Sequence, residues 1–224
     1  MKLVVRSDQA IDTATFQLTS EHWGKEFCDI LGKENIIEVI RRHWLSASSI
    51  NLYIRYLCEA YLHGTMANRF SFISSYEMDE ALNPNAHQHI AEMLKRHMGE
   101  DHLIFVPYNV GQHWVLVAIN TADETIYYMD HLRKQLKIRT HMQNLFNNAL
   151  VTYRAERGVQ PSSTKMSKTK WVTVQCPKQT NNDDCGYYVC LFIGDALHHG
   201  QTVIPEHCIG QKASSDRRRC QMDM

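Results

Sequence analysis

The chain has 224 residues, of which 44% are hydrophobic, and it carries 24 basic and 24 acidic side chains. This length and composition suffice for one globular domain with a full core. The balanced charge gives no overall attraction to nucleic acid, a membrane surface or an acidic substrate, so we expect none of these as a partner.

In chain order, the first elements are a packed N-terminal segment and a long helix. Within residues 1–35, Trp23 and Phe27 stand at helical spacing, which indicates an amphipathic piece packed on the domain. A short helix or turn is expected at 36–43. The clearest helical pattern follows a serine-rich start and covers 46–63.

The middle of the chain predicts a sheet. A short strand at 69–74 and a polar helix at 85–98 come first. Three runs rich in β-branched and aromatic residues follow, separated by tight turns, at 102–108, 113–119 and 125–129. We expect these three runs to be neighbouring strands of one sheet.

The last part of the chain predicts a helix at 136–155, a strand at 171–175 and an almost wholly apolar helix at 185–198. That last helix must be buried on most of its circumference. After Pro205 the composition becomes polar and basic, so residues 206–224 are expected to form a disordered tail and 36–205 the main domain.

Sequence features also bear on location and on cysteine chemistry. The first apolar run breaks at Arg6, too early for a secretory signal, and no stretch is long enough to span a bilayer, so we expect an intracellular monomer. The seven cysteines lack the even, close spacing of a disulfide framework. We expect mostly free thiols, with small buried residues at Cys28, Cys58 and Cys190.

A structural zinc site is an alternative use of some of these cysteines. The sequence has no C-x-x-C pair, so such a site would need an unusual ligand set such as Cys176, Cys190 and His207. Structural zinc usually has paired ligands a few residues apart, and the spacing therefore favours no metal.

The loop before the last helix carries the strongest chemical signal. N-cap residues from Gln179 to Asp184 deliver Cys185 to the first turn of a buried helix. Free backbone N–H groups and the helix dipole stabilise a thiolate there, which makes Cys185 a candidate nucleophile. Gly186 lets another backbone or a substrate come close. The alternative for Cys185 is a small buried residue that opens a core helix.

A thiolate nucleophile needs an imidazole base whose tautomer is fixed by an acceptor on its other nitrogen. The chain has 13 histidines, but among its three His-Trp pairs only His113 starts a predicted strand. Asp130 ends the next strand, and antiparallel pairing would bring the two together at one edge of the sheet. The alternative for Asp130 is a helix N-cap or a turn carboxylate.

Gln179 lies six residues before Cys185 and can complete the site. Its side-chain amide can donate to the oxyanion of a tetrahedral intermediate, beside the backbone N–H of Cys185. The alternative for Gln179 is a surface side chain in a polar loop.

This arrangement resembles the protease family that removes SUMO and related ubiquitin-like tags. The resemblance covers roughly residues 40–200 and is closest to transposon-associated plant members. It includes the His-to-Asp and Gln-to-Cys intervals and is carried by Trp44-Leu45, His113-Trp114, Asp130, Gln179 and Asp184-Cys185-Gly186.

The resemblance implies a fold and an activity. The fold would be α+β and papain-like, with a central mixed or antiparallel sheet flanked by helices and the nucleophile at the N-terminus of a buried helix. The activity would be cysteine-type cleavage after the Gly-Gly terminus of a ubiquitin-like protein, SUMO or a relative, or of its conjugates, in the nucleus or cytoplasm. No cofactor or metal is implied, and 36–205 would be the catalytic domain.

The resemblance also implies substrate contacts. Trp114 would be a lid over a narrow channel for the Gly-Gly tail, and Trp44 and Gly186 would contribute to substrate binding. The alternative for Trp114 is a core aromatic in a strand. Ser46-Ala47 stand where better-known members carry an Asn-Asp pair that helps bind SUMO, so the identity of the tag is open.

Two other functions remain as alternatives. One is a module of the same fold that binds a ubiquitin-like protein without cutting it, which the presence of all four chemical residues disfavours. The other is a cysteine acyltransferase, for which the sequence offers no basic cofactor-binding cluster.

Overall fold

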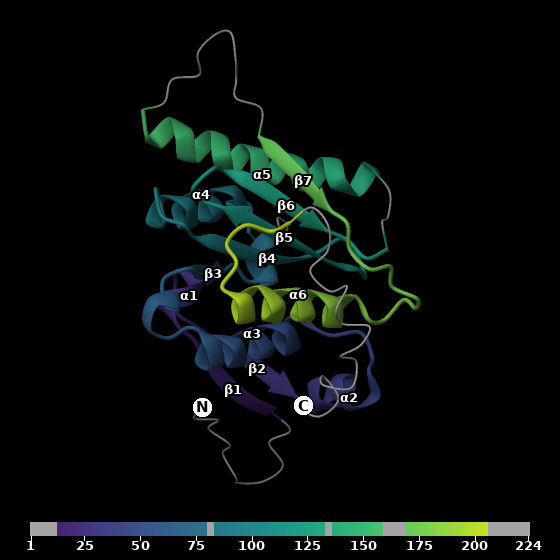
Figure 1. Cartoon of the computed structure of the whole chain (residues 1–224). Coiled ribbons are helices and arrows are strands. Elements are labelled where there is room, and N and C mark those ends of the chain that lie inside the picture. The colour runs from purple at the N-terminus through teal and green to yellow at the C-terminus, as the bar shows by residue number, and fades with distance from the viewer. Residues whose placement is uncertain (1–12, 80–82, 133–135, 159–168, 206–224) are drawn as a thin grey trace.

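A five-stranded mixed sheet forms the centre of the molecule, with its strands in sequence order from β3 to β7 (Figure 1). The three middle strands pair antiparallel, and the outer strands β3 and β7 run parallel to their inner neighbours. The bounds are Phe70–Phe72 for β3, Leu103–Asn109 for β4, Trp114–Asn120 for β5, Thr125–Met129 for β6 and Lys170–Val174 for β7. The predicted sheet is therefore confirmed, with β3 shorter than the expected strand.

The computed structural model describes residues 13–79, 83–132, 136–158 and 169–205. The predicted tail at 206–224 lies outside these ranges, as does His207. Within them, no helix is both long enough and apolar enough to cross a membrane.

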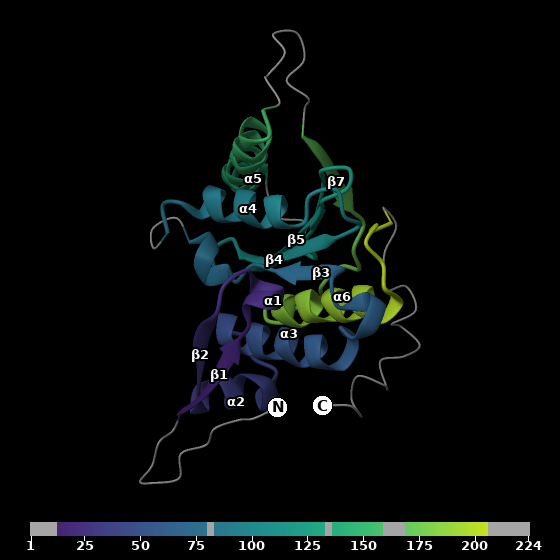
Figure 2. The same cartoon turned by 90° about the vertical axis from the view of Figure 1, so that its left-hand side faces the viewer.

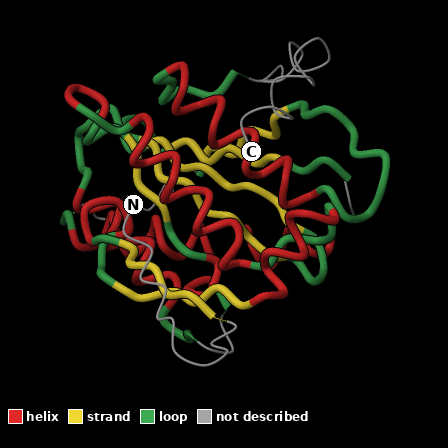
Figure 3. The backbone as a smooth tube through the Cα atoms, turned by 90° about the horizontal axis from the view of Figure 1, so that it is seen from below, coloured by secondary structure: helices red, strands yellow, loops and turns green. Residues whose placement is uncertain are grey.

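Helices cover both faces of the sheet (Figures 1 and 2). Helices α4 (Ala86–Arg96) and α5 (Leu136–Glu156) lie over one face. Helix α6 (Cys185–His199) lies against the other face, with α3 (Ala47–Tyr61) packed beneath it. Seen from below, helices lie in front of the sheet strands (Figure 3). The helices predicted after residue 35 are confirmed to within a few residues at their ends.

The core divides into two layers because successive strand residues face opposite sides of the sheet. In β5, Trp114, Leu116 and Ala118 pack on the side of α6 and α3. Val115, Val117 and Ile119 pack on the side of α4 and α5. All of these side chains are buried, so β5 reads as a continuous apolar run rather than as an alternating one.

The N-terminal segment is a hairpin and not the helical piece that Trp23 and Phe27 suggested. Strands β1 (Thr13–Leu18) and β2 (Phe27–Gly32) pair antiparallel on either side of α1 (Ser20–Trp23), a single helical turn. Gly24 has φ 75°, a left-handed conformation that ends α1, and Phe27 then starts β2. Leu18 and Trp23 are buried in the same core layer as α3 and α6.

Helix α2 (Lys33–Arg41) connects this hairpin to α3. Ser46 is the N-cap of α3, as its serine-rich start predicted, and its hydroxyl accepts a hydrogen bond from the Ser49 N–H at 3.3 Å. Glu38 of α2 strengthens this cap, because its carboxylate accepts the Ser46 N–H at 2.9 Å. The chain just before α3 is thereby fixed relative to α2.

Candidate active site

His113 and Asp130 lie within hydrogen-bond distance at one end of the sheet. His113 directly precedes β5, and Asp130 directly follows β6. These strands pair antiparallel, with Leu116 opposite Met129. The His113 Nε2–H donates to Asp130 Oδ1 at 2.8 Å, and both side chains are buried. The carboxylate is thus placed to hold the imidazole in one orientation.

Two further groups hold the Asp130 carboxylate. The Tyr128 hydroxyl donates to Oδ2 at 3.0 Å, and the Leu132 N–H donates to Oδ1 at 2.9 Å. Burial acts to raise the pKa of Asp130, but the hydrogen bond and charge of His113, together with these donors, lower it below its usual value. Sequence reasoning missed Tyr128, although its position two residues before Asp130 puts both on one side of the strand.

A tight turn fixes the backbone of His113. Gly111 and Gln112 have φ values of 81° and 55°, the left-handed pair that a two-residue hairpin turn requires. The Val110 N–H donates to the His113 carbonyl at 2.9 Å, and the Gly111 N–H donates to the Asn109 side chain at 2.9 Å. The imidazole therefore projects from a rigid strand end.

Cys185 is the first residue of α6, is fully buried and interacts with His113. Burial lowers the pKa of His113, but hydrogen bonds to Asp130 and Cys185, together with the negative charges of the Asp130 carboxylate and the Cys185 thiolate, outweigh it and raise this pKa to about 9. With Nε2 bonded to Asp130, His113 Nδ1 faces the Cys185 thiol and has no other hydrogen-bond partner within the described residues, so it is placed to exchange a proton with that thiol.

The other described cysteines differ from Cys185 in their surroundings. Cys58 and Cys190 are buried, as predicted, and burial raises the pKa of both thiols, to about 12 for Cys190. The prediction for Cys28 is wrong, because Cys28 is exposed. Its neighbour Asp29 points inward instead, where the Ser48 hydroxyl donates to its carboxylate at 2.8 Å.

Asn181 organises the loop that leads to Cys185. Its side-chain oxygen accepts hydrogen bonds from the Gln179 Nε2, at 3.2 Å, and from the backbone N–H groups of Asp183 and Asp184, at 3.3 and 3.1 Å. Gln179 is only 3% exposed, which excludes the alternative that it is a surface side chain in a polar loop. Its role as an oxyanion donor stays a prediction.

Asp184 is the N-cap of α6, yet its side chain makes no capping hydrogen bond. One carboxylate oxygen instead lies 3.6 Å from the Arg42 Nη2, and the Arg42 guanidinium also lies over the Tyr187 ring. The negative charge beside the nucleophile therefore has a counter-charge, although the exposure of Arg42 makes the pair weak.

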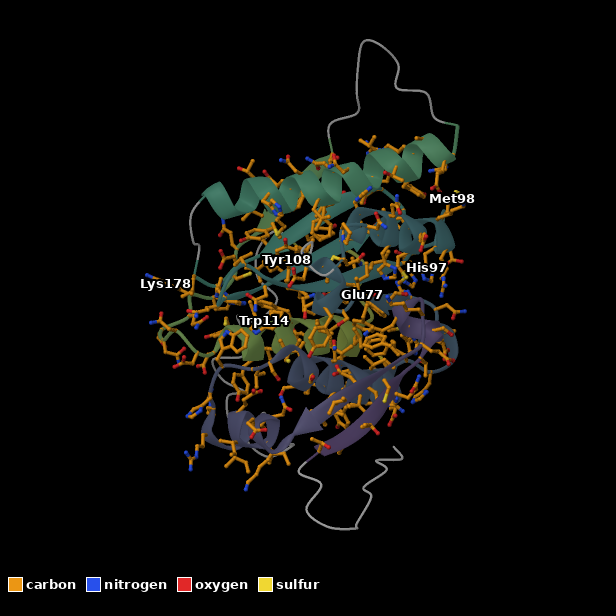
Figure 4. All side chains as sticks on the ribbon, turned by 180° about the vertical axis from the view of Figure 1, so that it is seen from behind. Glu77, His97, Met98, Tyr108, Trp114 and Lys178 are labelled. Carbon is orange, nitrogen blue, oxygen red and sulfur yellow. The ribbon has the colours of Figure 1, made fainter. Side chains whose placement is uncertain are left out.

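Trp114 lies next to the N-terminal end of α6 (Figure 4), where it forms an aromatic cluster with Trp44 and contacts Leu45. Trp114 is only 1% exposed, and its Nε1–H donates to the Leu45 carbonyl at 2.7 Å. The Trp44 ring stacks on the Trp114 ring with centroids 5.5 Å apart. Trp114 is thus a core aromatic residue at the start of a strand, which was the alternative to a lid, and its role as a lid over the substrate channel stays a prediction.

Because Gly186 has no side chain, Leu45 packs closely against the backbone of α6 at this position. A close approach was expected here, although of another backbone or a substrate. A Cβ at position 186 would lie 2.9 Å from the Leu45 Cβ, closer than such atoms pack. The short segment with Trp44 and Leu45 therefore sits directly on the first turn of α6. A contact between Gly186 and substrate stays a prediction.

We predict that Gly186→Ala destabilises the fold by about 1–3 kcal/mol, the usual effect of overpacking. Gly194→Ala in the same helix is the matched control, because its new Cβ would meet nothing closer than 3.4 Å, an ordinary contact. The control should be neutral or stabilise by up to about 1 kcal/mol. Urea unfolding of both variants is the measurement, and equal midpoints would contradict the close contact with Leu45.

One group of described residues has the side chains of a metal site, namely His97, Glu100 and His102. Its geometry does not fit a metal ion. The hydroxyl of Ser71 bonds both Nε2 atoms, at 3.0 and 2.8 Å, while the Nδ1 atoms contact Glu100 and the Asn68 carbonyl. The two rings stack with planes only 8° from parallel, so a shared ion would lie out of both ring planes.

The comparisons with known proteins agree with this architecture. Residues 43–223 match the model of the Ulp1 protease family, C-terminal catalytic domain. The chain is 25% identical to ubiquitin-like-specific protease 1 of Saccharomyces cerevisiae over 75% of its own length, and 26% identical to ubiquitin-like-specific protease ESD4 of Arabidopsis thaliana over 67%. It spans only 27% and 32% of the lengths of these two relatives.

Two solved structures share the fold. The first is the C-terminal Ulp1 protease domain in complex with Smt3, the yeast ortholog of SUMO; the TM-score is 0.55 at 21% identity, covering 85% of this chain and 80% of that one. The second is a de-sumoylating protease, with a TM-score of 0.58 at 16% identity, covering 82% and 73%. The α+β, papain-like fold is thereby confirmed. Since the family match spans most of its length, the chain belongs to the Ulp1 protease family.

Proposed function

We propose that this chain is a cysteine protease that cleaves after the C-terminal Gly-Gly of a ubiquitin-like protein, SUMO or a relative, in deconjugation or precursor processing. The observation that carries the proposal is the buried His113–Asp130 hydrogen bond beside Cys185 at the start of α6. Membership of the Ulp1 protease family supports the same activity.

The first chemical step joins Cys185 to the substrate. His113 Nδ1 takes the thiol proton, and the thiolate sulfur attacks the carbonyl carbon of the terminal glycine. The Cys185 N–H and the Gln179 side-chain amide donate to the oxyanion. One Gln179 N–H already bonds Asn181, which orients the amide and leaves its second N–H for the oxyanion.

The second step releases the products. The protonated His113 gives its proton to the leaving lysine amine, or to the α-amine of a precursor's extension, as the C–N bond breaks and a thioester forms. Water then attacks the thioester while His113 takes a proton from it, and the carboxylate product leaves as the thiol is restored. Asp130 keeps the imidazole in the tautomer that both transfers need.

Recognition of the substrate involves its Gly-Gly tail, for which this chain offers candidate residues, and the folded body of the tag, for which the family's usual residues are absent. Trp44, Trp114 and Gly186 would line the path of the Gly-Gly tail, where glycine fits because it has no side chain. At the position of the family's Asn-Asp pair, Ser46 is committed to capping α3 and Ala47 has no polar side chain. Contacts to the body of the tag must therefore come from other residues. The proposal also includes the place of action, which is inside the cell and, more specifically, in the nucleus.

A panel of ubiquitin-like proteins with C-terminal electrophiles tests the proposal. We expect covalent labelling of the parent chain by at least one member, no labelling of Cys185→Ala, and full labelling of Cys28→Ala. Cys28 is the matched control because it is the exposed cysteine among those described. Absence of labelling by every member would overturn the protease, and retained binding in that case would identify the non-cutting module.

A further inference from the structure

His131, next to Asp130, faces the opposite side of the chain. Asp130 and His131 follow the last residue of β6, and their side chains meet different elements: Asp130 bonds His113, whereas His131 packs against α6. The His131 ring stacks on Tyr188, with centroids 4.2 Å apart, and on Phe192, with centroids 4.7 Å apart. Both partners lie on α6, within two turns of Cys185. The ring is only 1% exposed.

His131 also holds the segment that carries Gln179. Its Nδ1 lies 3.1 Å from the Pro177 carbonyl, and since a carbonyl only accepts, Nδ1 must carry the proton and donate. The His131 carbonyl accepts the Gln179 N–H at 3.3 Å. Burial lowers the pKa of His131 to about 4, so the ring is neutral near pH 7 and places no second charge beside His113.

We propose that His131 is a positioning residue that fixes the segments of Asp130, Gln179 and Cys185 relative to one another. The three segments come from different parts of the chain: the end of β6, the loop after β7 and the start of α6. His131 is bonded to or stacked on each of them. Catalytic geometry tolerates displacements of only a fraction of an ångström, so loss of this connection lowers turnover. The inference rests on the proposed function.

His102 is a matched control for a purely structural role. It is fully buried, burial lowers its pKa to about 3, and its Nδ1 also bonds a backbone carbonyl, that of Asn68, at 2.7 Å. It directly precedes Leu103, which pairs with Asn120 at the end of β5 farthest from His113. Figure 4 shows His97, on which His102 stacks, well away from Trp114.

Two substitutions separate the contacts of His131. His131→Phe keeps an aromatic ring for the stack but removes the donor to Pro177, whereas His131→Asn keeps a donor and removes the stack. Both are expected to lower kcat by about 10–10²-fold, because the reacting groups are misplaced, while KM stays within about two-fold. His102→Asn should lower the unfolding midpoint and leave kcat unchanged. The assay is cleavage of a ubiquitin-like protein with a fluorogenic C-terminal amide, at a temperature where each variant is folded.

The outcomes distinguish the inference from the proposed function. An unchanged kcat in both His131 variants of an active parent overturns the inference alone, as does an equal loss of kcat in His102→Asn. A parent without turnover that depends on Cys185 overturns the proposed function and the inference with it. If neither His131 variant folds, Tyr188→Leu removes one stacking ring from a half-buried position, and its kcat must then fall for the inference to stand.

Discussion

Replacing Asp130 with asparagine is expected to lower kcat/KM by about 10³–10⁴-fold, the order seen when the orienting acid of a catalytic triad is lost. The substitution preserves the shape of the side chain but leaves one acceptor oxygen in place of two, so it cannot serve both the Tyr128 hydroxyl, which bonds Oδ2, and the Leu132 N–H, which bonds Oδ1. It also removes the negative charge that faces His113 Nε2. An uncharged amide no longer stabilises the imidazolium that forms when His113 takes the thiol proton.

The same variant should change the pH dependence of kcat/KM. In the parent, the pKa of His113 is raised to about 9, so the alkaline limb of the profile should lie near that pH. Without the Asp130 charge, the limb should move to lower pH, toward the ordinary histidine value of about 6.5. For stability, a raised pKa means that the contribution of His113 is complete below about 6.5 and is lost as the pH rises through about 9.

Steady-state kinetics over a pH series measure both effects, and Asp123→Asn is the matched control. Asp123 lies in the turn before β6, at the opposite end of that strand, where it accepts the Thr125 N–H and lies 3.6 Å from the Lys170 ammonium. This control should keep the kcat/KM and the pH profile of the parent. A loss below ten-fold in Asp130→Asn, or an unmoved alkaline limb, would show that Asp130 does not orient His113.

The sequence was a good guide wherever a pattern within one segment decides the structure. The apolar run of α6, the cap at Ser46 and the β-branched runs of the central strands each predicted their element. The interval between His113 and Asp130 was informative for a related reason. A hairpin with a short turn, here residues 121–124 between the paired Asn120 and Thr125, has few registers, so residues at its two open ends must be close.

The features that the sequence did not reveal depend on contacts between distant segments. Trp23 and Phe27 have helical spacing, but the left-handed Gly24 between them ends the helix. Cys28 looked like a core residue because its type is usually buried, whereas the inward position in β2 is taken by Asp29. Hydrogen bonds from α3 satisfy that carboxylate, and no local pattern in β2 signals them.

Trp114→Phe is the second substitution from which we expect a large effect. The smaller ring leaves a cavity in a fully packed layer, and it removes the donor to the Leu45 carbonyl. A buried carbonyl without a donor costs about 1–3 kcal/mol, and the cavity adds to this loss. Because Leu45 rests on Gly186, displacement of its backbone also disturbs the first turn of α6 and the Cys185 nucleophile.

Trp171→Phe is the control that separates these causes. Trp171 is also a strand tryptophan with a bonded indole, since its Nε1–H donates to the Asn147 side chain at 3.0 Å. That partner is only half-buried and can turn to water, so the loss should stay near about 1 kcal/mol. Urea unfolding gives the stabilities, and cleavage kinetics give kcat/KM. Only Trp114→Phe should lower both. If it lowers stability while kcat/KM stays at the parent value, the aromatic cluster belongs to the core alone and the lid interpretation fails.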